Sequence, residues 1–214
     1  MALAEDVASP YAGGFAYLAL GHLRLLRGEY LLAADCLQKS RAAFLESQST
    51  VMAAAVAAFL GRSFSYLGED ISAIETLESS LRTTLQIGVR VQQPLRMVFL
   101  SEAYQHAGRP SEALATAQHA LSLAQEQAEE ASREYALHQI ARLLMDKGRE
   151  HSSSAVRGIR EAQAVAAALH LLPLVARCHD SLARALQSCG ATDEAAVEAD
   201  AATNERVRLG IQAW

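Results

Sequence analysis

Apolar and small residues recur along the chain at a spacing that predicts helices. Leu100, Ala103, Tyr104 and Ala107 follow the i, i+3, i+4, i+7 spacing that places side chains on one face of a helix. No alternating run of β-branched residues bounded by a hairpin turn is present, so no strand is predicted. The pattern therefore favours an all-α protein.

Glycines divide the chain into units of nearly constant length. The first four of these glycines are evenly spaced, and the fifth comes two positions later than the same step would place it. Because the residue just past a helix end often takes a left-handed conformation that glycine adopts most easily, each glycine predicts a turn between two helices. These turn glycines are Gly28, Gly68, Gly108, Gly148 and Gly190, and the apolar residues eight positions before them are Leu20, Leu60, Leu100, Ile140 and Leu182.

The fourth unit departs from this register by two positions. Polar residues stand where the other units have small or apolar ones, and a shift by two positions recovers Ala155, Ile159 and Ala162. A two-residue insertion in the loop 149–154 explains both the slip and the longer last spacing. We therefore expect the second helix of this unit to pack through the shifted residues.

The repeat predicts five antiparallel helix pairs that stack in chain order as a right-handed superhelix. Small residues such as Gly21 and Ala33 let the two helices of a pair approach closely, while residues such as Leu20 and Leu37 fill the space between them. Each pair leaves an apolar face that only the next pair can cover. We expect an N-terminal tail over residues 1–10 and one helical domain over residues 11–214, with units at about 11–48, 49–88, 89–128, 129–170 and 171–214.

The motif residues resemble the tetratricopeptide repeat (TPR) superfamily. The second unit carries the resemblance through Phe59-Leu60-Gly61, Phe64, Gly68, Ala73 and Leu77. The step from Gly28 to Gly68 exceeds the usual repeat length of about 34 residues, which implies longer helices. The resemblance implies a superhelix of helix pairs whose first helices line a concave, partner-binding groove.

A narrower resemblance concerns the last unit. The segment Leu172-Pro173-Leu174-Val175-Ala176-Arg177-Cys178-His179 and the closing Ala213-Trp214 are similar to the C-terminal helical region of large bacterial signalling proteins. In those proteins such repeats follow an AAA-type ATPase module and often a class III nucleotide cyclase. Both catalytic modules are absent from this chain, so the resemblance implies a regulatory or scaffold part without activity of its own.

Charge and hydropathy exclude several kinds of partner. The net charge is −5 and the 19 basic residues are scattered, which does not fit a nucleic-acid-binding protein. No uninterrupted apolar run is long enough to span a bilayer, and the first residues lack the features of a secretory signal. We expect a cytoplasmic protein, and the scarcity of lysine, with only Lys39 and Lys147, fits a GC-rich bacterial genome.

The sequence offers little support for catalysis or for a cofactor. Neither lysine lies in a phosphate-binding loop, and the seven histidines include no pair at metal-binding spacing, so we expect no cofactor and no metal. Cys178, His179 and Asp180 are consecutive, and on a helix their side chains diverge by about 100° and cannot act on one atom. We therefore predict that the chain is not an enzyme.

The concave face predicted by the resemblance supplies the candidate site. Its residues lie two positions after the Leu20-type residues, or one turn before that position, and they are His22, Arg62, Glu102, His138, Arg142, Asp180 and Arg184. Guanidinium groups pair with carboxylates through two parallel hydrogen bonds, so three arginines in one row favour a carboxylate or an acidic peptide. The alternative is an ordinary solvated helix face, in which Asp180 neutralises Arg184 as an i, i+4 pair.

Apolar side chains surround the first helix, which includes Phe15, Leu18, Leu23 and Leu26, whereas a terminal repeat usually has a polar outer face. We expect either an upstream segment or a second copy of the chain to cover it. For the domain as a whole, the sequence predicts a module that binds a protein or peptide in its groove. The alternative function is a sensor whose groove binds a small ligand.

Overall fold

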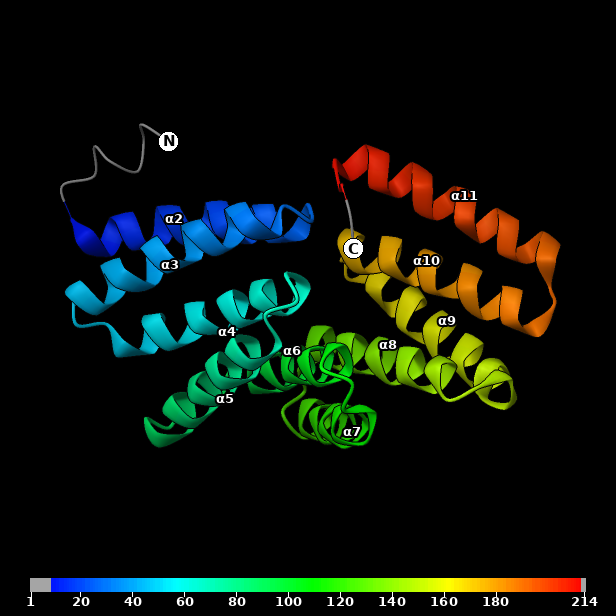
Figure 1. Cartoon of the computed structure of the whole chain (residues 1–214), viewed down its shortest axis with the longest axis horizontal. Helices are drawn as coiled ribbons and strands as arrows, with labels where there is room; N and C mark the ends of the chain where they lie inside the picture. Colours follow the sequence, from blue (N-terminus) through cyan, green and yellow to red (C-terminus); the bar gives the residue numbers. More distant parts are fainter. Residues whose placement is uncertain (1–8, 213–214) are drawn as a thin grey trace.

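A computed structural model describes residues 9–212, and within this range the chain is helical and contains no strand (Figure 1). Each described helix lacks the combination of length and apolar character that crossing a bilayer requires. The α-helices are α2 (Pro10–Leu26), α3 (Tyr30–Glu46), α4 (Thr50–Tyr66), α5 (Asp70–Gln86), α6 (Gln93–His106), α7 (Pro110–Glu126), α8 (Glu130–Asp146), α9 (Ser152–Ala168), α10 (Leu172–Cys189) and α11 (Thr192–Leu209), with a 3₁₀-helix, η1 (Arg149–His151), before α9.

Consecutive helices form five antiparallel pairs, from α2 with α3 to α10 with α11, which confirms the predicted helical-repeat architecture. The first helices of successive pairs also contact one another, α2 with α4, α4 with α6, α6 with α8 and α8 with α10. They form the inner layer of the solenoid. The second helices pack against this layer from outside (Figure 1).

The turns within the pairs use glycine for its backbone conformation. All five turn glycines have positive φ, and at Gly68, where φ is +77°, an added Cβ would meet no atom within 4 Å. Space is therefore available there, and the left-handed backbone is what requires glycine. In the fourth unit the residues after Gly148 form η1, and Ala155, Ile159 and Ala162 are each fully buried, as the insertion predicts.

Close approach within a pair depends on small residues and on serine. An added Cβ on Gly61 would lie 2.7 Å from Cγ of the fully buried Leu77, so this position must lack a side chain. Ser80 Oγ on α5 donates to the carbonyl oxygen of Ala54 on α4 at 2.7 Å. The helices therefore approach closely enough for a side-chain hydroxyl to bind the backbone of the neighbouring helix.

The solenoid curves until its two ends meet. In Figure 1 the pair α2 and α3 and the pair α10 and α11 stand at opposite ends of an arc whose base is α6 and α7. The backbone N–H of Gln212, after α11, donates to the carbonyl oxygen of Arg27, after α2, at 2.8 Å. The concave side therefore encloses a central space and does not form a long groove open at both ends.

A polar pocket on the concave face

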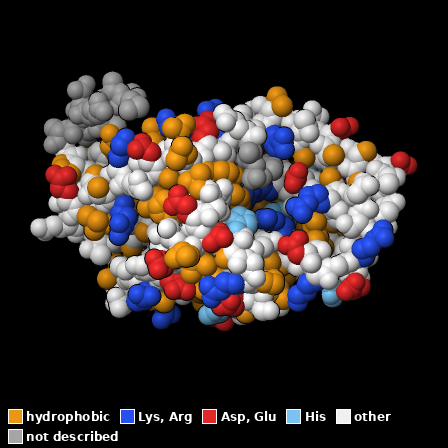
Figure 2. All heavy atoms as spheres, in the orientation of Figure 1, with side chains coloured by type: hydrophobic (Ala, Val, Ile, Leu, Met, Phe, Trp, Pro, Cys, Tyr) orange, Lys and Arg blue, Asp and Glu red, His pale blue; other side chains and the backbone are white. Residues whose placement is uncertain are grey.

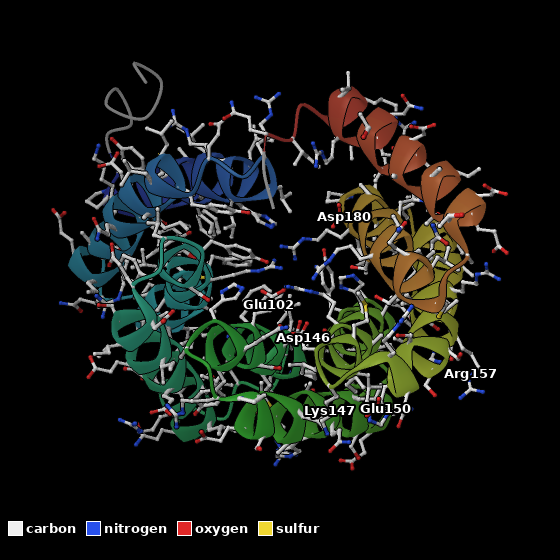
Figure 3. All side chains as sticks on the ribbon, turned by 45° about the vertical axis from the view of Figure 1, so that its right-hand side comes forward. Glu102, Asp146, Lys147, Glu150, Arg157 and Asp180 are labelled. Carbon is white, nitrogen blue, oxygen red and sulfur yellow. The ribbon has the colours of Figure 1, made fainter. Side chains whose placement is uncertain are left out.

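The inner helices α4, α6, α8 and α10 surround a pocket of about 470 Å³. Figure 2 shows a hollow at the centre of this face, with histidine and basic side chains at its edge. In Figure 3, Glu102 and Asp180 lie toward the enclosed space, whereas Lys147, Glu150 and Arg157 lie on the outer rim. The pocket is lined by Ser65, Tyr66, Gly68, Asp70, His106, His138, Arg142, Arg177, Asp180, Ser181 and Arg184.

Two residues of the expected groove row are buried and bind each other. Arg62 is 6% exposed and Glu102 is 2% exposed. Nε and Nη2 of Arg62 donate to Oε2 and Oε1 of Glu102 at 2.7 and 2.9 Å, in the two-bond geometry typical of this pair. The expectation that Arg62 faces solvent and is free for a partner is therefore wrong, because the tight curvature turns this part of the inner face into core.

Arg177 completes a buried ionic cluster with Arg62 and Glu102. Its Nη1 donates to Oε1 of Glu102 at 3.2 Å, and its Nη2 donates to the hydroxyl of Tyr66, whose ring stacks on Tyr30 with centroids 4.5 Å apart. Burial alone would raise the pKa of Glu102, but Arg62 and Arg177 lower it to about 2. The carboxylate therefore stays charged and ties α10 to α4 and α6.

The two histidines of the expected site lie in different surroundings. His138 is buried, and its Nε2 lies 2.9 Å from Oγ of Ser181. Burial, with the charges of Arg142 and Arg177, lowers its pKa to about 3, so the ring is neutral near pH 7. His22 is exposed, lies outside the pocket lining and packs on Phe59 with ring centroids 4.8 Å apart.

Arg142, Asp180 and Arg184 are the expected site residues that remain available in the pocket. Among the described residues, none of their side chains forms an ion pair or a hydrogen bond. The i, i+4 pair of Asp180 with Arg184, which was the alternative to a binding role, is therefore absent, although the two lie one turn apart on α10. Arg142 lines the same pocket as His106 and His138, and its charge contributes to lowering the pKa of both rings.

Sequence reasoning missed Arg177, Tyr66 and His106. Each lies on the same helix face as a residue of the predicted row, because Arg177 precedes Arg184 by seven positions and the other two follow Arg62 and Glu102 by four. Extending the row by one or two turns along each inner helix would have found them. The helical periodicity of the sequence is therefore sufficient to predict that these three residues lie on the concave face.

The arrangement can form ion pairs and hydrogen bonds, and two serine–histidine contacts lie in the lining, Ser65 Oγ with His106 Nδ1 at 2.8 Å and Ser181 Oγ with His138 Nε2 at 2.9 Å. Cys178 is fully buried, and burial raises the pKa of its thiol to about 12, which keeps it protonated and inaccessible. Within residues 9–212, no group of three or more histidine, cysteine, aspartate or glutamate side chains is arranged to hold a metal ion. The lining contains side chains of both charges, Arg142, Arg184 and Asp180 among them.

Comparison with known proteins identifies the fold. No protein-family model and no curated protein sequence matches the chain. A putative kinesin light chain with TPR-like repeats from Podosopora anserina is similar in structure, with a TM-score of 0.59, 20% identity and coverage of 94% of this chain and 98% of that chain. A Rap protein complexed with Competence and Sporulation Factor is also similar in structure, with a TM-score of 0.69, 10% identity and coverage of 96% of this chain and 67% of that chain.

A third similar structure is aspartyl phosphate phosphatase F from Bacillus subtilis, with a TM-score of 0.67 and 14% identity over 92% of this chain and 51% of that chain. Identity this low relates folds and leaves activities and partners unassigned. The chain therefore has the helical-repeat fold of TPR-like proteins.

Proposed function

We propose that the chain is a non-enzymatic module that binds a protein partner by holding an acidic peptide segment in the pocket on its concave face. The observation that carries this proposal is the pair Arg142 and Arg184, which line the pocket without an ionic partner among the described residues. Arg142 is half-buried and Arg184 is exposed, and a half-buried guanidinium group binds a carboxylate more strongly than one on an open surface. The ligand therefore supplies the negative charge that the pocket lacks at these two positions.

The buried cluster supports this role by fixing the frame around the pocket. Glu102 already satisfies Arg62 and Arg177, so these two arginines serve the structure, and Arg142 and Arg184 are left for the ligand. The Rap protein of similar fold was solved in complex with Competence and Sporulation Factor, which supports a binding role for this fold. The proposal needs no catalytic step.

We place this module in a bacterial, cytoplasmic signalling assembly. The resemblance of the segment 172–179 to the helical region of AAA-ATPase and nucleotide cyclase signalling proteins supports this setting, as does the near absence of lysine. In that setting the module docks a regulatory partner for catalytic modules carried elsewhere. A pull-down with the wild-type chain as bait tests this setting separately from the pocket. Co-purification of an ATPase or a nucleotide cyclase supports it, and absence of both contradicts it.

Selection from a displayed library of random octapeptides tests the pocket. We expect enriched peptides to contain glutamate or aspartate and to bind about tenfold or more weakly to the R142A/R184A double variant, since a hydrogen bond to a charged group contributes about 1.5–3 kcal/mol. The control is the R82A/R157A variant, which removes two exposed arginines outside the pocket. Equal loss in both double variants would show general charge attraction and refute the proposal.

The size of the pocket favours a second candidate, a sensor for a small ligand. A volume of about 470 Å³ lies within the range of small-molecule sites, and the contact of Gln212, after the last helix, with Arg27, after the first described helix, bounds the concave space. A sensor predicts a rise in melting temperature with a metabolite and no enrichment of peptides. Thermal-shift measurement on the wild type and the R142A/R184A variant distinguishes this function from peptide binding.

A further inference from the structure

The pocket contains unpaired groups of both charges, and this limits what it can bind. Arg142 and Arg184 carry the positive charge, while Asp180 on α10 and Asp70 at the start of α5 place carboxylates in the same lining. Asp180 forms no ion pair or hydrogen bond through its side chain with any described residue, and Oδ1 of Asp70 is buried without a hydrogen-bond partner among them. A purely acidic ligand would therefore meet repulsion from two carboxylates as well as attraction from two arginines.

Two other polar groups of the lining, Arg177 and His138, add no unpaired charge to the two arginines and two aspartates. Arg177 is engaged by Glu102 and by the hydroxyl of Tyr66. His138 lies against Ser181 with its Nε2 2.9 Å from the serine oxygen, and its lowered pKa of about 3 keeps the ring neutral near pH 7. The lining thus has two uncommitted guanidinium groups and two aspartates, and complementary binding requires a ligand with both charges.

The placement of Asp180 and Arg184 sets the spacing of those charges. Residues four apart on a helix present their side chains about 5–6 Å from each other on one face. Since these two do not bind each other, a ligand can accept from Arg184 and donate to Asp180 at neighbouring positions. Arg142 on α8 faces the same pocket and can hold the second oxygen of the ligand carboxylate.

We propose, building on the peptide-binding function above, that the pocket selects a mixed-charge segment, in which a lysine or arginine lies within one or two residues of a glutamate or aspartate. Arg142 and Arg184 bind the acidic side chain, and Asp180 binds the basic one. Asp70, in the same lining, favours the same basic group electrostatically. The volume of about 470 Å³ lies in the range of small-ligand sites, so a short charged segment and not a long one fits it.

The same octapeptide library tests this specificity. Against the wild-type chain we expect enriched peptides to contain neighbouring acidic and basic residues. Against Asp180→Asn we expect the basic residue to lose its enrichment while the acidic residue keeps it, and against R142Q/R184Q we expect the reverse. Replacing the basic residue of an enriched synthetic peptide by alanine is expected to weaken binding about tenfold to the wild type and less than twofold to Asp180→Asn.

The outcomes separate this inference from the function on which it rests. Enrichment of acidic residues alone, with the loss in R142A/R184A retained, would overturn the mixed-charge inference and leave peptide binding intact. Absence of any enriched peptide that depends on the two arginines would overturn both. Binding of the free dipeptide lysyl-glutamate in the absence of binding by capped peptides would also overturn the inference, in favour of a small-ligand sensor.

Discussion

Replacing Glu102 by glutamine tests the buried cluster that holds the inner helices together. The substitution keeps the shape of the side chain but leaves Arg62 and Arg177 without their shared carboxylate. Arg62 is only 6% exposed, so water cannot replace the lost ion pair there. The lowering of the pKa of Glu102 from 4.5 to about 2 corresponds to about 3 kcal/mol, at about 1.4 kcal/mol per pKa unit. This agrees with the cost of about 3–5 kcal/mol for removing one partner of a buried ion pair.

Thermal and urea unfolding followed by circular dichroism measure the effect. For a domain of this size, about 3 kcal/mol lowers the melting temperature by about 6–12 °C. The matched control is Glu112→Gln, which removes the carboxylate of an exposed pair with Arg109 and is expected to have little effect on stability, because solvent screens exposed ion pairs. A loss for Glu102→Gln no larger than the loss for Glu112→Gln would refute the reasoning.

The pH dependence provides a second test of the same cluster. Because the pKa of Glu102 is lower in the folded chain than in the unfolded chain, its contribution is present above about pH 4.5 and is lost as the pH falls toward 2. The difference in unfolding free energy between the wild type and Glu102→Gln should therefore shrink over this range. A difference that stays constant down to pH 2 would contradict the assigned charge state.

Three further tests concern other features. Gly61→Ala should cost about 1–3 kcal/mol in urea unfolding, because its Cβ would lie 2.7 Å from Cγ of Leu77, whereas Gly158→Ala, with its nearest contact at 3.5 Å, should cost nothing. The pKa of His138 is about 3 in the folded chain and about 6.5 in the unfolded chain, so the free energy of unfolding should fall as the pH drops below 6.5. His138→Asn should remove about 2 kcal/mol of the decrease in unfolding free energy between pH 7 and pH 5. If a second copy covers the first pair, Leu23→Glu should convert a dimer to a monomer in sedimentation equilibrium, and a monomeric wild type would contradict that interface. Leu23 is 49% exposed in the single chain.

The local features of the fold could be predicted from the sequence because the repeat is local. Turn glycines, the apolar stripe and the two-residue insertion all act within one helix pair, and the burial of Ile159 follows from them. The curvature could not be predicted in this way. It results from small rotations between successive pairs that add up along the chain, and no short motif encodes their sum.

The candidate site shows the same division. Arg62 and Glu102 occupy the same position in adjacent units, so the constant step of the repeat already placed them side by side. Their burial, and the contact of Arg177 with Tyr66 from a distant unit, depend on the curvature. The row of residues predicted on the concave face is therefore divided into a buried structural pair, Arg62 and Glu102, and residues that line the pocket, such as Arg142 and Arg184.

The hydrogen bond between Gln212 and Arg27 has a consequence for how this chain can evolve and fold. An open solenoid tolerates the duplication or deletion of a unit, because each unit contacts only its neighbours. Here the last described residues meet the first pair, so an added unit would collide with that pair and a lost one would leave the ring incomplete. Contacts between distant positions also raise the contact order, which slows folding.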